Sequence, residues 1–372
     1  MTESEFQKLL YNEIKTFEDL ENEIIKNDKC CACGACIAYC ESQSFNVIEM
    51  NGYTPEFKSE KSLNNCTKCG VCYYICPQTP IIMNELNAIY SIEDNIGRII
   101  EIMAAKTKDS AIEKVGQDGG IVSTLIKFLF EKNKIDAAIV SEYDNEFRPI
   151  PKIIFNKEDL VKSAGTRYSI SPQLFPLKDL YRISQEVIKK KRIFDIDQLR
   201  MAFIGTPCQC RAIRKMNFLR VKPAHVIKYI FSLFCFENFD YDKLFDTLKK
   251  ETNLDPIDIR KTWIKKNFFI ESKSNEQFEV NIKTLDPAVR KNCRECNDFI
   301  GRFSDISIGS SGAPKKYSMI ISRTEKGHKL MKSIRSNGLI DQFVLSASQS
   351  ADWINQKLNL YNKLISSKVN HK

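Results

Sequence analysis

Residues 30–76 read CCACGACIAYCESQSFNVIEMNGYTPEFKSEKSLNNCTKCGVCYYIC, and this stretch contains the spacing CxxCxxCxxxC twice. Two C-x-x-C runs in a chain of intracellular type favour metal ligation over a disulfide framework. Two zinc sites would not explain why each run continues to a third and a fourth cysteine at regular spacing. The eight cysteines of the two runs are Cys30, Cys33, Cys36, Cys40, Cys66, Cys69, Cys72 and Cys76.

The spacing is that of bacterial-type ferredoxins, in which three closely spaced thiolates bind one 4Fe-4S cluster and the fourth binds the other. Gly34 and Gly70 each follow the second cysteine of a run, where a wrapping backbone favours a residue that tolerates positive φ. Cys31 would break the spacing as a ligand, so we interpret it as a structural thiol. We assign one cluster to Cys30, Cys33, Cys36 and Cys76, and the second cluster to Cys66, Cys69, Cys72 and Cys40.

At 372 residues, with 43% hydrophobic and 28% charged residues, the chain has the composition of a globular protein of two or three domains. The amino terminus, MTESEFQKLLYNEIK, lacks an apolar leader core, and the chain has fourteen cysteines, so we expect a cytoplasmic protein. No run of 18 apolar residues predicts a transmembrane segment, although docking on a membrane complex stays open. The net charge of +9 suits an anionic partner, but no zinc-finger or helix-turn-helix motif favours a nucleic acid.

The patterning divides the chain into four segments. Apolar residues at helical spacing predict a helical segment over residues 1–28, and residues 29–80 form the predicted ferredoxin domain. Alternating strands and helices over residues 81–342 predict a larger α/β domain with a mixed sheet, followed by a helical tail at 343–372. The expected fold class is therefore a mixture of α+β and α/β.

Individual elements can also be placed. Asn51–Gly52 predicts a hairpin within residues 45–57. Strands are expected at 99–105, 135–140, 200–204, 226–234, 305–309 and 318–322, with paired strands within 263–282. Helices are expected at 121–132, 210–216, 241–254, 325–337 and 344–367.

Three loops stand where α/β proteins place their ligands, at the ends of predicted strands. They cover residues 117–120, 163–172 and 205–209. In the first loop, Gly119 and Gly120 open a helix whose amino-terminal amides would suit an anionic cofactor.

Five cysteines lie outside the two runs: Cys208, Cys210, Cys235, Cys293 and Cys296. Cys293 and Cys296 have ligand spacing, and Cys208 and Cys235 follow predicted strands. Four of these thiolates could hold a third 4Fe-4S cluster, with Cys210 left over. Zinc would fit the same number of ligands, so the residues alone leave both open.

Seven motifs occur along the second part of the chain: QDGG (117–120), AGTRYSISP (164–172), GTPCQ (205–209), FCFENF (234–239), CRECNDF (293–299), DISIGSSG (305–312) and ISRTEKG (321–327). Together they resemble the family formed by the beta subunits of coenzyme F420-reducing hydrogenases and dehydrogenases over about residues 80–340. A two-cluster ferredoxin ahead of this domain is similar to the electron-input subunit of F420H2 dehydrogenase complexes. It is also similar to the amino-terminal half of F420-dependent sulfite reductase.

The resemblance implies that residues 81–342 bind FAD and coenzyme F420 and hold a third 4Fe-4S cluster near the flavin. Carried over by motif, the ligands of this cluster are Cys208, Cys235, Cys293 and Cys296. The flavin would be lined by Gln117, Gly119, Gly120, Ser123, Gly165, Thr166, Arg167, Tyr168, Gly205, Thr206 and Pro207. Glu237 and Asn238 would support the neighbouring ligand Cys235. Arg167, Lys162 and Arg211 are candidates for contacts with the anionic groups of F420.

The function implied is that of an FAD-containing iron–sulfur oxidoreductase. It would exchange hydride with coenzyme F420 and pass single electrons through 4Fe-4S clusters to or from a partner protein, as in the energy metabolism of methanogenic archaea. Because the cofactors supply the chemistry, no catalytic acid or base is predicted. The expected partner is an electron-accepting subunit or a membrane-bound dehydrogenase or hydrogenase complex. The alternative is a reductase of the same family that acts on another substrate, with ferredoxin as the electron donor.

Overall fold

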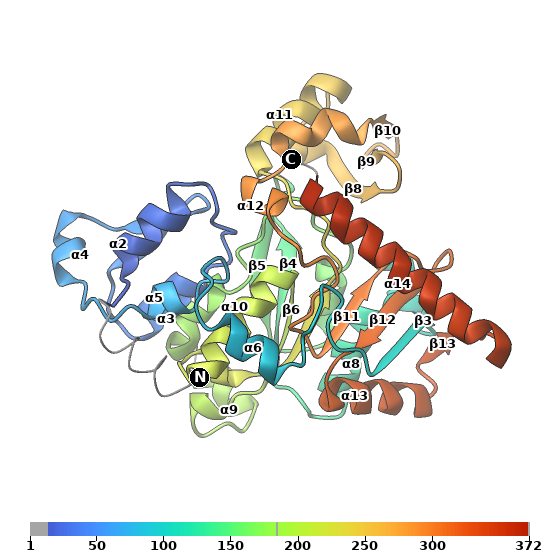
Figure 1. Ribbon diagram of the computed structural model, residues 1–372, viewed down its shortest axis with the longest axis horizontal. Helices are drawn as coiled ribbons and strands as arrows, with labels where there is room; N and C mark the ends of the chain where they lie inside the picture. The colour runs from blue at the N-terminus through green and yellow to red at the C-terminus, as the bar shows by residue number, and fades with distance from the viewer. Residues whose placement is uncertain (1–13, 184, 371–372) are drawn as a thin grey trace.

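The computed structural model describes residues 14–183 and 185–370. In this part of the chain, eight strands form a mixed sheet, as predicted, with four parallel strands in the middle and antiparallel strands on both sides (Figure 1). Across the sheet the order is β13 (Ile340–Gln342), β3 (Glu101–Thr107), β12 (Ser318–Ser322), β11 (Ile306–Gly309), β7 (Ile227–Leu233), β6 (Met201–Gly205), β4 (Ala137–Tyr143) and β5 (Pro149–Ile154).

The central strands are apolar almost throughout because helices cover both faces of the sheet. β6 is buried at every position. Its consecutive residues Phe203 and Ile204 belong to hydrophobic clusters on opposite faces of the sheet. The edge strand β5 was not predicted, since Pro149 and Pro151 interrupt a strand pattern. Both prolines are tolerated because β5 pairs with β4 alone.

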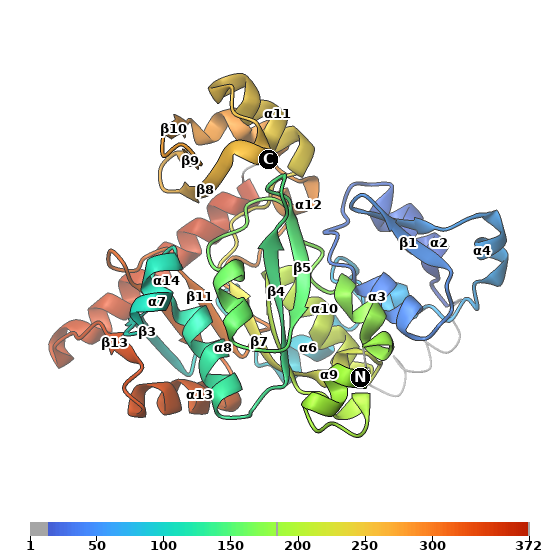
Figure 2. The ribbon, with the colours of Figure 1, turned by 180° about the vertical axis from the view of Figure 1, so that it is seen from behind.

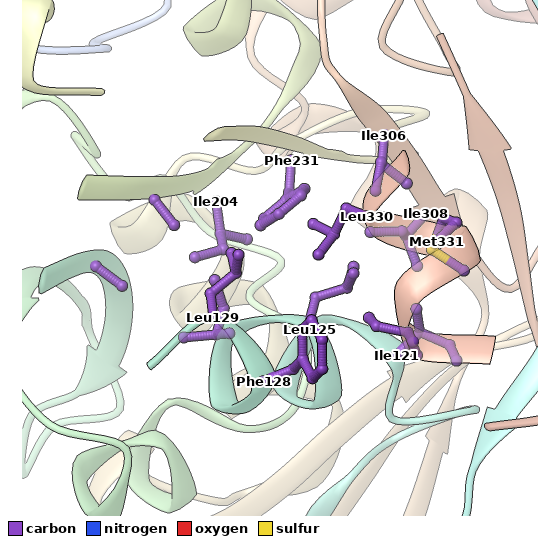
Figure 3. Packing of buried hydrophobic residues seen from close by; sticks show 14 of the residues in the cluster. Ile121, Leu125, Phe128, Leu129, Ile204, Phe231, Ile306, Ile308, Leu330 and Met331 are labelled. Atoms are coloured by element: carbon purple, nitrogen blue, oxygen red, sulfur yellow. The ribbon is translucent and has the colours of Figure 1, made fainter. Parts of the chain in front are cut away.

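Three helices cover one face of the sheet (Figure 2). They are α7 (Ser110–Val115), α8 (Ile121–Glu131) and α13 (Glu325–Ser336). The predicted amphipathic helix at 121–132 is α8, and Figure 3 shows its Leu125 and Leu129 directed toward the sheet, where Phe231 of β7 belongs to the same cluster. Each buried leucine contributes about 1.5–3 kcal/mol relative to an exposed one.

The opposite face carries α6 (Met83–Ile89), α10 (Pro207–Phe218) and the long α14 (Ala347–Asn370) (Figure 1). α10 begins with a capping box in which Thr206 and Gln209 bond each other's backbone. The predicted helix at 344–367 is α14, whose Tyr361 and Ile365 pack against Phe299. In the described residues, no helix is long and apolar enough to cross a membrane.

A separate antiparallel sheet of three strands stands above the large sheet (Figure 1). It confirms the predicted pairing of strands within residues 263–282. Its elements are β8 (Ile259–Ile264), β9 (Phe268–Ser272) and β10 (Gln277–Val280), accompanied by α11 (Tyr241–Thr252) and α12 (Lys291–Arg294).

The amino-terminal part, residues 14–82, forms a lobe at the side of the large sheet (Figure 1). The hairpin predicted around Asn51–Gly52 is present, with Asn51 paired to Thr54. Of the predicted helical segment, Phe6, Leu9 and Leu10 lie outside the described residues. The lobe contains α2 (Phe17–Leu20), the π-helix η1 (Glu21–Ile25), α3 (Ala35–Ser42), β1 (Ile48–Asn51), β2 (Thr54–Phe57), α4 (Glu60–Asn65) and α5 (Val71–Tyr74).

The lobe contacts the large domain through η3 (Phe175–Arg182), a 3-10 helix that packs along α3. The Leu174 amide donates to the Cys33 carbonyl at 2.9 Å, and the Phe175 backbone touches Gly34. The remaining short helices are η2 (Glu158–Ser163), η3 (Phe175–Arg182), α9 (Gln185–Lys190), η4 (Ile196–Gln198), η5 (Ala224–Val226), η6 (Pro256–Asp258) and η7 (Ile282–Ala288).

Candidate functional site

Four cysteines of the amino-terminal lobe, Cys30, Cys33, Cys36 and Cys76, line one cavity together with Cys31. We call them the inner quartet. Burial raises the pKa of the Cys36 thiol, and the thiols of Cys30, Cys72 and Cys76 raise it further, so Cys36 lies near cysteines of both runs. Burial and the Cys30 thiol likewise raise the pKa of Cys76 to about 11. The structure thus brings together the four residues that the spacing assigned to one cluster.

The outer quartet, Cys40, Cys66, Cys69 and Cys72, lines a second cavity. Burial raises the pKa of Cys72, and the thiols of Cys69, Cys66 and Cys40 contribute after it. Cys69 is exposed to solvent. The exchange of the fourth cysteine between the runs, with Cys40 joining the second run and Cys76 the first, is the arrangement expected from the spacing.

Two glycines let the chain wrap around these cavities. Gly34 and Gly70 have φ of 83° and 74°, as predicted for residues of a wrapping backbone. A Cβ at Gly34 would lie 2.7 Å from the backbone nitrogen of Phe175, and a Cβ at Gly70 would lie 2.6 Å from the Lys15 carbonyl oxygen. The glycines therefore provide both the backbone conformation and the close approach of neighbouring segments.

The third quartet, Cys208, Cys235, Cys293 and Cys296, is assembled from α10, the segment after β7, α12 and the loop behind it. Burial raises the pKa of Cys235, and the thiols of Cys293, Cys208 and Cys296 raise it further, so these four sulfur atoms also converge. They come from positions up to 88 residues apart in sequence, as 208 and 296 show.

Four thiol groups are a donor set that either a zinc ion or a 4Fe-4S cluster uses. A zinc ion binds all its thiolates at about 2.3 Å, whereas in a 4Fe-4S cubane each thiolate binds a different iron. The inner and outer quartets each line a cavity. Among the described residues, no set of three or more His, Cys, Asp or Glu side chains is arranged to hold a metal ion.

Two further cysteines lie outside the quartets. The Cys31 thiol is hydrogen-bonded to that of Cys208, and this contact and burial raise the pKa of Cys208. Cys31 therefore stands between the inner and third quartets, a position that its sequence neighbours did not indicate. Cys210 is fully buried in the core under α10, where its thiol faces the Phe231 carbonyl at 3.9 Å.

Four cationic side chains lie near the quartets, and no sequence motif predicted that position for any of them. Lys215 is buried, and its ammonium group reaches the Cys76 carbonyl at 2.7 Å. Burial lowers the pKa of Lys215 to about 7, against the raising effect of the Cys76 thiolate. The other three are Arg211, Arg290 and Lys368, of which the sequence motifs indicate only Arg211, and that for a different role.

The loop of residues 117–120 is joined to the AGTRY loop by a hydrogen-bond network. Gln117 Nε2 donates to the Tyr168 hydroxyl at 2.9 Å, and the Thr166 amide donates to Gln117 Oε1 at 3.1 Å. Gly119 lies in close contact with the backbone of β12, and Gly120 has a φ of 67° at the start of α8. The predicted flavin-lining loops are therefore neighbours in space.

The GTPCQ loop joins the same group of loops. Gln209 Nε2 donates to the Ser171 carbonyl at 2.7 Å, which ties the start of α10 to the end of the AGTRY loop. The remaining predicted residues lie at the ends of the elements that flank these loops. Gly205 ends β6, Thr206 and Pro207 begin α10, Gly165 has a φ of 91°, and Ser123 lies in the first turn of α8.

Arg167 has a structural role within its loop. Its guanidinium donates to the carbonyls of Ala164, Gly165, Ser141 and Lys162 and stands over the Tyr143 ring. Burial lowers its pKa from the ordinary value. The arginine predicted to meet an anion therefore holds the loop backbone.

The other predicted polar residues fall in different places. Lys162 is exposed, whereas Arg211 lies beside the third quartet, where Cys296 and Cys208 hold its pKa above the ordinary value against desolvation. The backbone amide of Asn238 bonds the Cys293 thiol, and Asn238 Oδ1 is buried without a partner. The Glu237 carbonyl faces the Cys235 thiol at 3.8 Å. An unpaired buried acceptor beside the quartet is a feature that a bound group with an N–H donor would satisfy.

Two regions of the chain match models of one protein family. Residues 102–178 match the amino-terminal part, and residues 198–345 the carboxy-terminal part, of the family described as "Coenzyme F420 hydrogenase/dehydrogenase, beta subunit". Among individual relatives, the F subunit of the F(420)H(2) dehydrogenase from Methanosarcina mazei is 29% identical over 84% of this chain and 84% of its own length.

Coenzyme F420-dependent sulfite reductase of Methanocaldococcus jannaschii is also 29% identical over 84% of this chain, but the chain spans only 47% of that protein. Among solved structures, a chain of the F420-reducing [NiFe] hydrogenase complex from Methanosarcina barkeri superimposes with a TM-score of 0.63 at 26% identity, covering 75% of this chain and 91% of that one. The two matched regions and these relatives agree with the order of motifs in the sequence. The chain therefore belongs to the family of coenzyme F420 hydrogenase/dehydrogenase beta subunits, which are components of oxidoreductases.

Proposed function

We propose that the protein is an FAD-containing iron–sulfur oxidoreductase that exchanges hydride with coenzyme F420 and passes electrons to or from a partner protein through three 4Fe-4S clusters. The observation that carries the proposal is the convergence of twelve cysteines into three separate quartets, two of which line cavities. When bound, the flavin would exchange hydride and the clusters would carry single electrons. The names of the relatives support F420 as the substrate.

The residues of the chain would hold and orient these groups. Gly119 and Gly120 bring the start of α8 close to the sheet, so its first amide groups would face the phosphates of FAD. Gln117 and Tyr168 fix the two loops relative to each other, which would keep the ring of the flavin in one orientation. The third quartet adjoins these loops because Cys208 and Gln209 belong to the same turn of α10.

The quartets form a series, and this order supports the outer quartet as the exchange point with a partner. The third and inner quartets adjoin through the contact between Cys31 and Cys208. The inner and outer quartets adjoin through Cys36 and Cys72, whose thiols interact. Cys69 of the outer quartet is exposed. A partner protein would therefore dock on the amino-terminal lobe beside the exposed Cys69.

Two measurements test the proposal. Protein purified without oxygen should contain roughly twelve irons and one FAD per chain, since each cubane holds four irons. Anaerobic mixing with F420H2 should bleach the flavin absorption within the turnover time. Full cofactor content without bleaching would point to the same-family reductase acting on another substrate with ferredoxin as donor. About eight irons would remove the third quartet from the metal ligands.

A further inference from the structure

Three cations bind the quartets in the same way, through the carbonyl oxygen of a cysteine rather than through its sulfur. The bonds are Lys215 Nζ to Cys76 at 2.7 Å, Arg290 Nη2 to Cys30 at 2.8 Å, and Lys368 Nζ to Cys235 at 2.8 Å. The cysteines of these three bonds belong to the inner and third quartets. Each cation comes from the large domain, and two of the cysteines belong to the amino-terminal lobe.

Lys215 Nζ has three oxygen neighbours: the carbonyls of Cys76 and Thr79, both at 2.7 Å, and the Thr79 hydroxyl at 3.1 Å. The Thr79 hydroxyl also lies 3.0 Å from the carbonyls of Tyr73 and Cys76. The amine of Lys215 therefore ties α10 to the segment that carries Cys76.

The third quartet has two cations. Lys368 of α14 is 3% exposed, and besides Cys235 it reaches the Asp298 carbonyl at 3.4 Å. Arg211 lies on the other side, where its charge interacts with Cys296 and Cys208. A buried lysine costs free energy unless something negative compensates it. In the proposed holoprotein, the cluster bound by the third quartet would supply that compensation, because Cys235, Cys293 and Cys296 are among the acidic groups that act on Lys368.

The outer quartet differs. In the part of the chain that the structure describes, no lysine or arginine donates to a carbonyl of its four cysteines. Its buried charged neighbour is Glu41, which is 8% exposed and raises the pKa of Cys40 after the effect of burial. Two lysines near this quartet pair with carboxylates: Lys58 with the buried Glu41 at 3.1 Å, and the exposed Lys68, which lines the outer cavity, with Glu18 at 3.9 Å.

These contrasts bear on reduction potential, which net charge and hydrogen bonding around a cluster help to set. Reduction adds one negative charge, and a buried cation stabilises that charge strongly because the surroundings have a low dielectric constant. Solvent at Cys69 would also raise the reduction potential of the outer cluster. Water reaches that quartet at one edge only, however, whereas the cations of the other two quartets contact the backbone of the ligands.

Building on the proposed function, we propose that the buried cations give the inner and third clusters higher potentials than the outer cluster. The relay then draws electrons inward, from a low-potential protein donor docked at the outer quartet toward the flavin. Lys215, Arg290, Arg211 and Lys368 act as positioning residues that set this gradient, and none of them needs to touch substrate.

The test is a redox titration of the holoprotein followed by electron paramagnetic resonance. The wild type should show one cluster of lowest potential and two of higher potential. Lys368→Met and Lys215→Met, which keep length and remove charge, should each lower the potential of one higher cluster by at least 59 mV, a tenfold change in the ratio of reduced to oxidised form for one electron. The charge-conserving variants Lys368→Arg and Lys215→Arg should keep the wild-type potentials. Lys157→Met is the control, because Lys157 is exposed and pairs with Glu131, and it should leave the potentials of all three clusters unchanged.

Iron and FAD contents are measured first, so that the proposed function and the proposed gradient of potentials can be refuted independently. Less than the full complement in the wild type contradicts the proposed function. A full complement in which the outer cluster, identified by its loss in Cys69→Ser, does not have the lowest potential overturns the gradient alone. Unchanged potentials in both methionine variants would also overturn it. Loss of iron in Lys215→Met, through undocking of the lobe, leaves Lys368→Met as the deciding variant.

Discussion

Gln117 Nε2 lies 2.9 Å from the hydroxyl of Tyr168, and this single contact joins two loops that are 51 residues apart in sequence. The Tyr168 hydroxyl also accepts from the Ile264 amide of β8 at 3.0 Å. The contact therefore connects the large sheet, the AGTRY loop and the three-stranded sheet. Its position among the loops proposed to line the flavin makes it a point where local structure and cofactor binding can be tested together.

We expect Gln117→Leu to weaken FAD retention. The substitution leaves the half-buried Thr166 amide without its partner and removes one of the two donors to the Tyr168 hydroxyl, at a cost of about 1–3 kcal/mol in total. The protein should lose flavin during gel filtration at a concentration where the wild type keeps it. Gln277→Leu, at an exposed position of β10, is the control. Equal flavin content in the two variants would contradict a role for Gln117 in holding the loops.

Cys31 and Cys33 are neighbours with different predicted roles. Cys33 belongs to the inner quartet, whereas Cys31 contacts Cys208 but stands outside the ligand spacing. Cys33→Ala should therefore remove about four irons per chain, because one cubane loses a ligand. Cys31→Ala should keep the full iron content. Colorimetric iron analysis on anaerobically purified protein distinguishes them, and loss of iron in Cys31→Ala would make that thiol a ligand.

Gly34→Ala should be far more harmful than Gly52→Ala. Both glycines have positive φ, so both substitutions strain the backbone by about 1 kcal/mol. Only at Gly34 would the new methyl group also collide with the docking helix η3, at 2.7 Å from the Phe175 nitrogen, whereas nothing lies within 4 Å at Gly52. Iron content and urea unfolding should both fall in Gly34→Ala only. Similar behaviour of the two variants would show that backbone strain alone matters.

The sequence predictions are accurate where a feature depends on residues that are close together in the sequence. The hairpin at Asn51–Gly52 depends on a local turn, and the strand and helix of residues 201–218 depend on local periodicity, so both were predictable. The two ferredoxin-type quartets were readable because ligand spacing is a short-range pattern. The members of the third quartet came from a family resemblance, since spacing alone identified only Cys293 and Cys296.

The cations near the quartets carried no readable signal. Lys215 meets Cys76 across 139 residues, and Lys368 meets Cys235 across 133 residues. In the sequence, Lys368 belongs to the predicted helical tail, and nothing local marks a lysine that a folded core will enclose. Arg167 shows the opposite case. Its motif suggested an anion contact, while the folded loop uses its guanidinium on backbone carbonyls.

Asp305, just before β11, should be a principal stabilising residue of the large domain. Its buried carboxylate accepts from the Ile230 amide at 2.9 Å and from Arg214 at 3.1 Å, and it pairs with Lys326 at 3.1 Å. Asp305→Asn would leave Arg214 buried without its counter-charge, at a cost of about 3–5 kcal/mol. Asp341→Asn, in a half-exposed pair with Lys106, should cost about 1 kcal/mol or less.

The same carboxylate predicts a dependence of stability on pH. Burial alone would raise the pKa of Asp305, but Arg214 and Lys326 hold it below its ordinary value of 3.8. Because the folded pKa is the lower one, the contribution is present above about pH 4 and is lost as the pH falls through the folded pKa. Urea unfolding between pH 7 and pH 3 should show a steeper loss in the wild type than in Asp305→Asn. Parallel curves would mean that other carboxylates dominate the acid sensitivity of the fold.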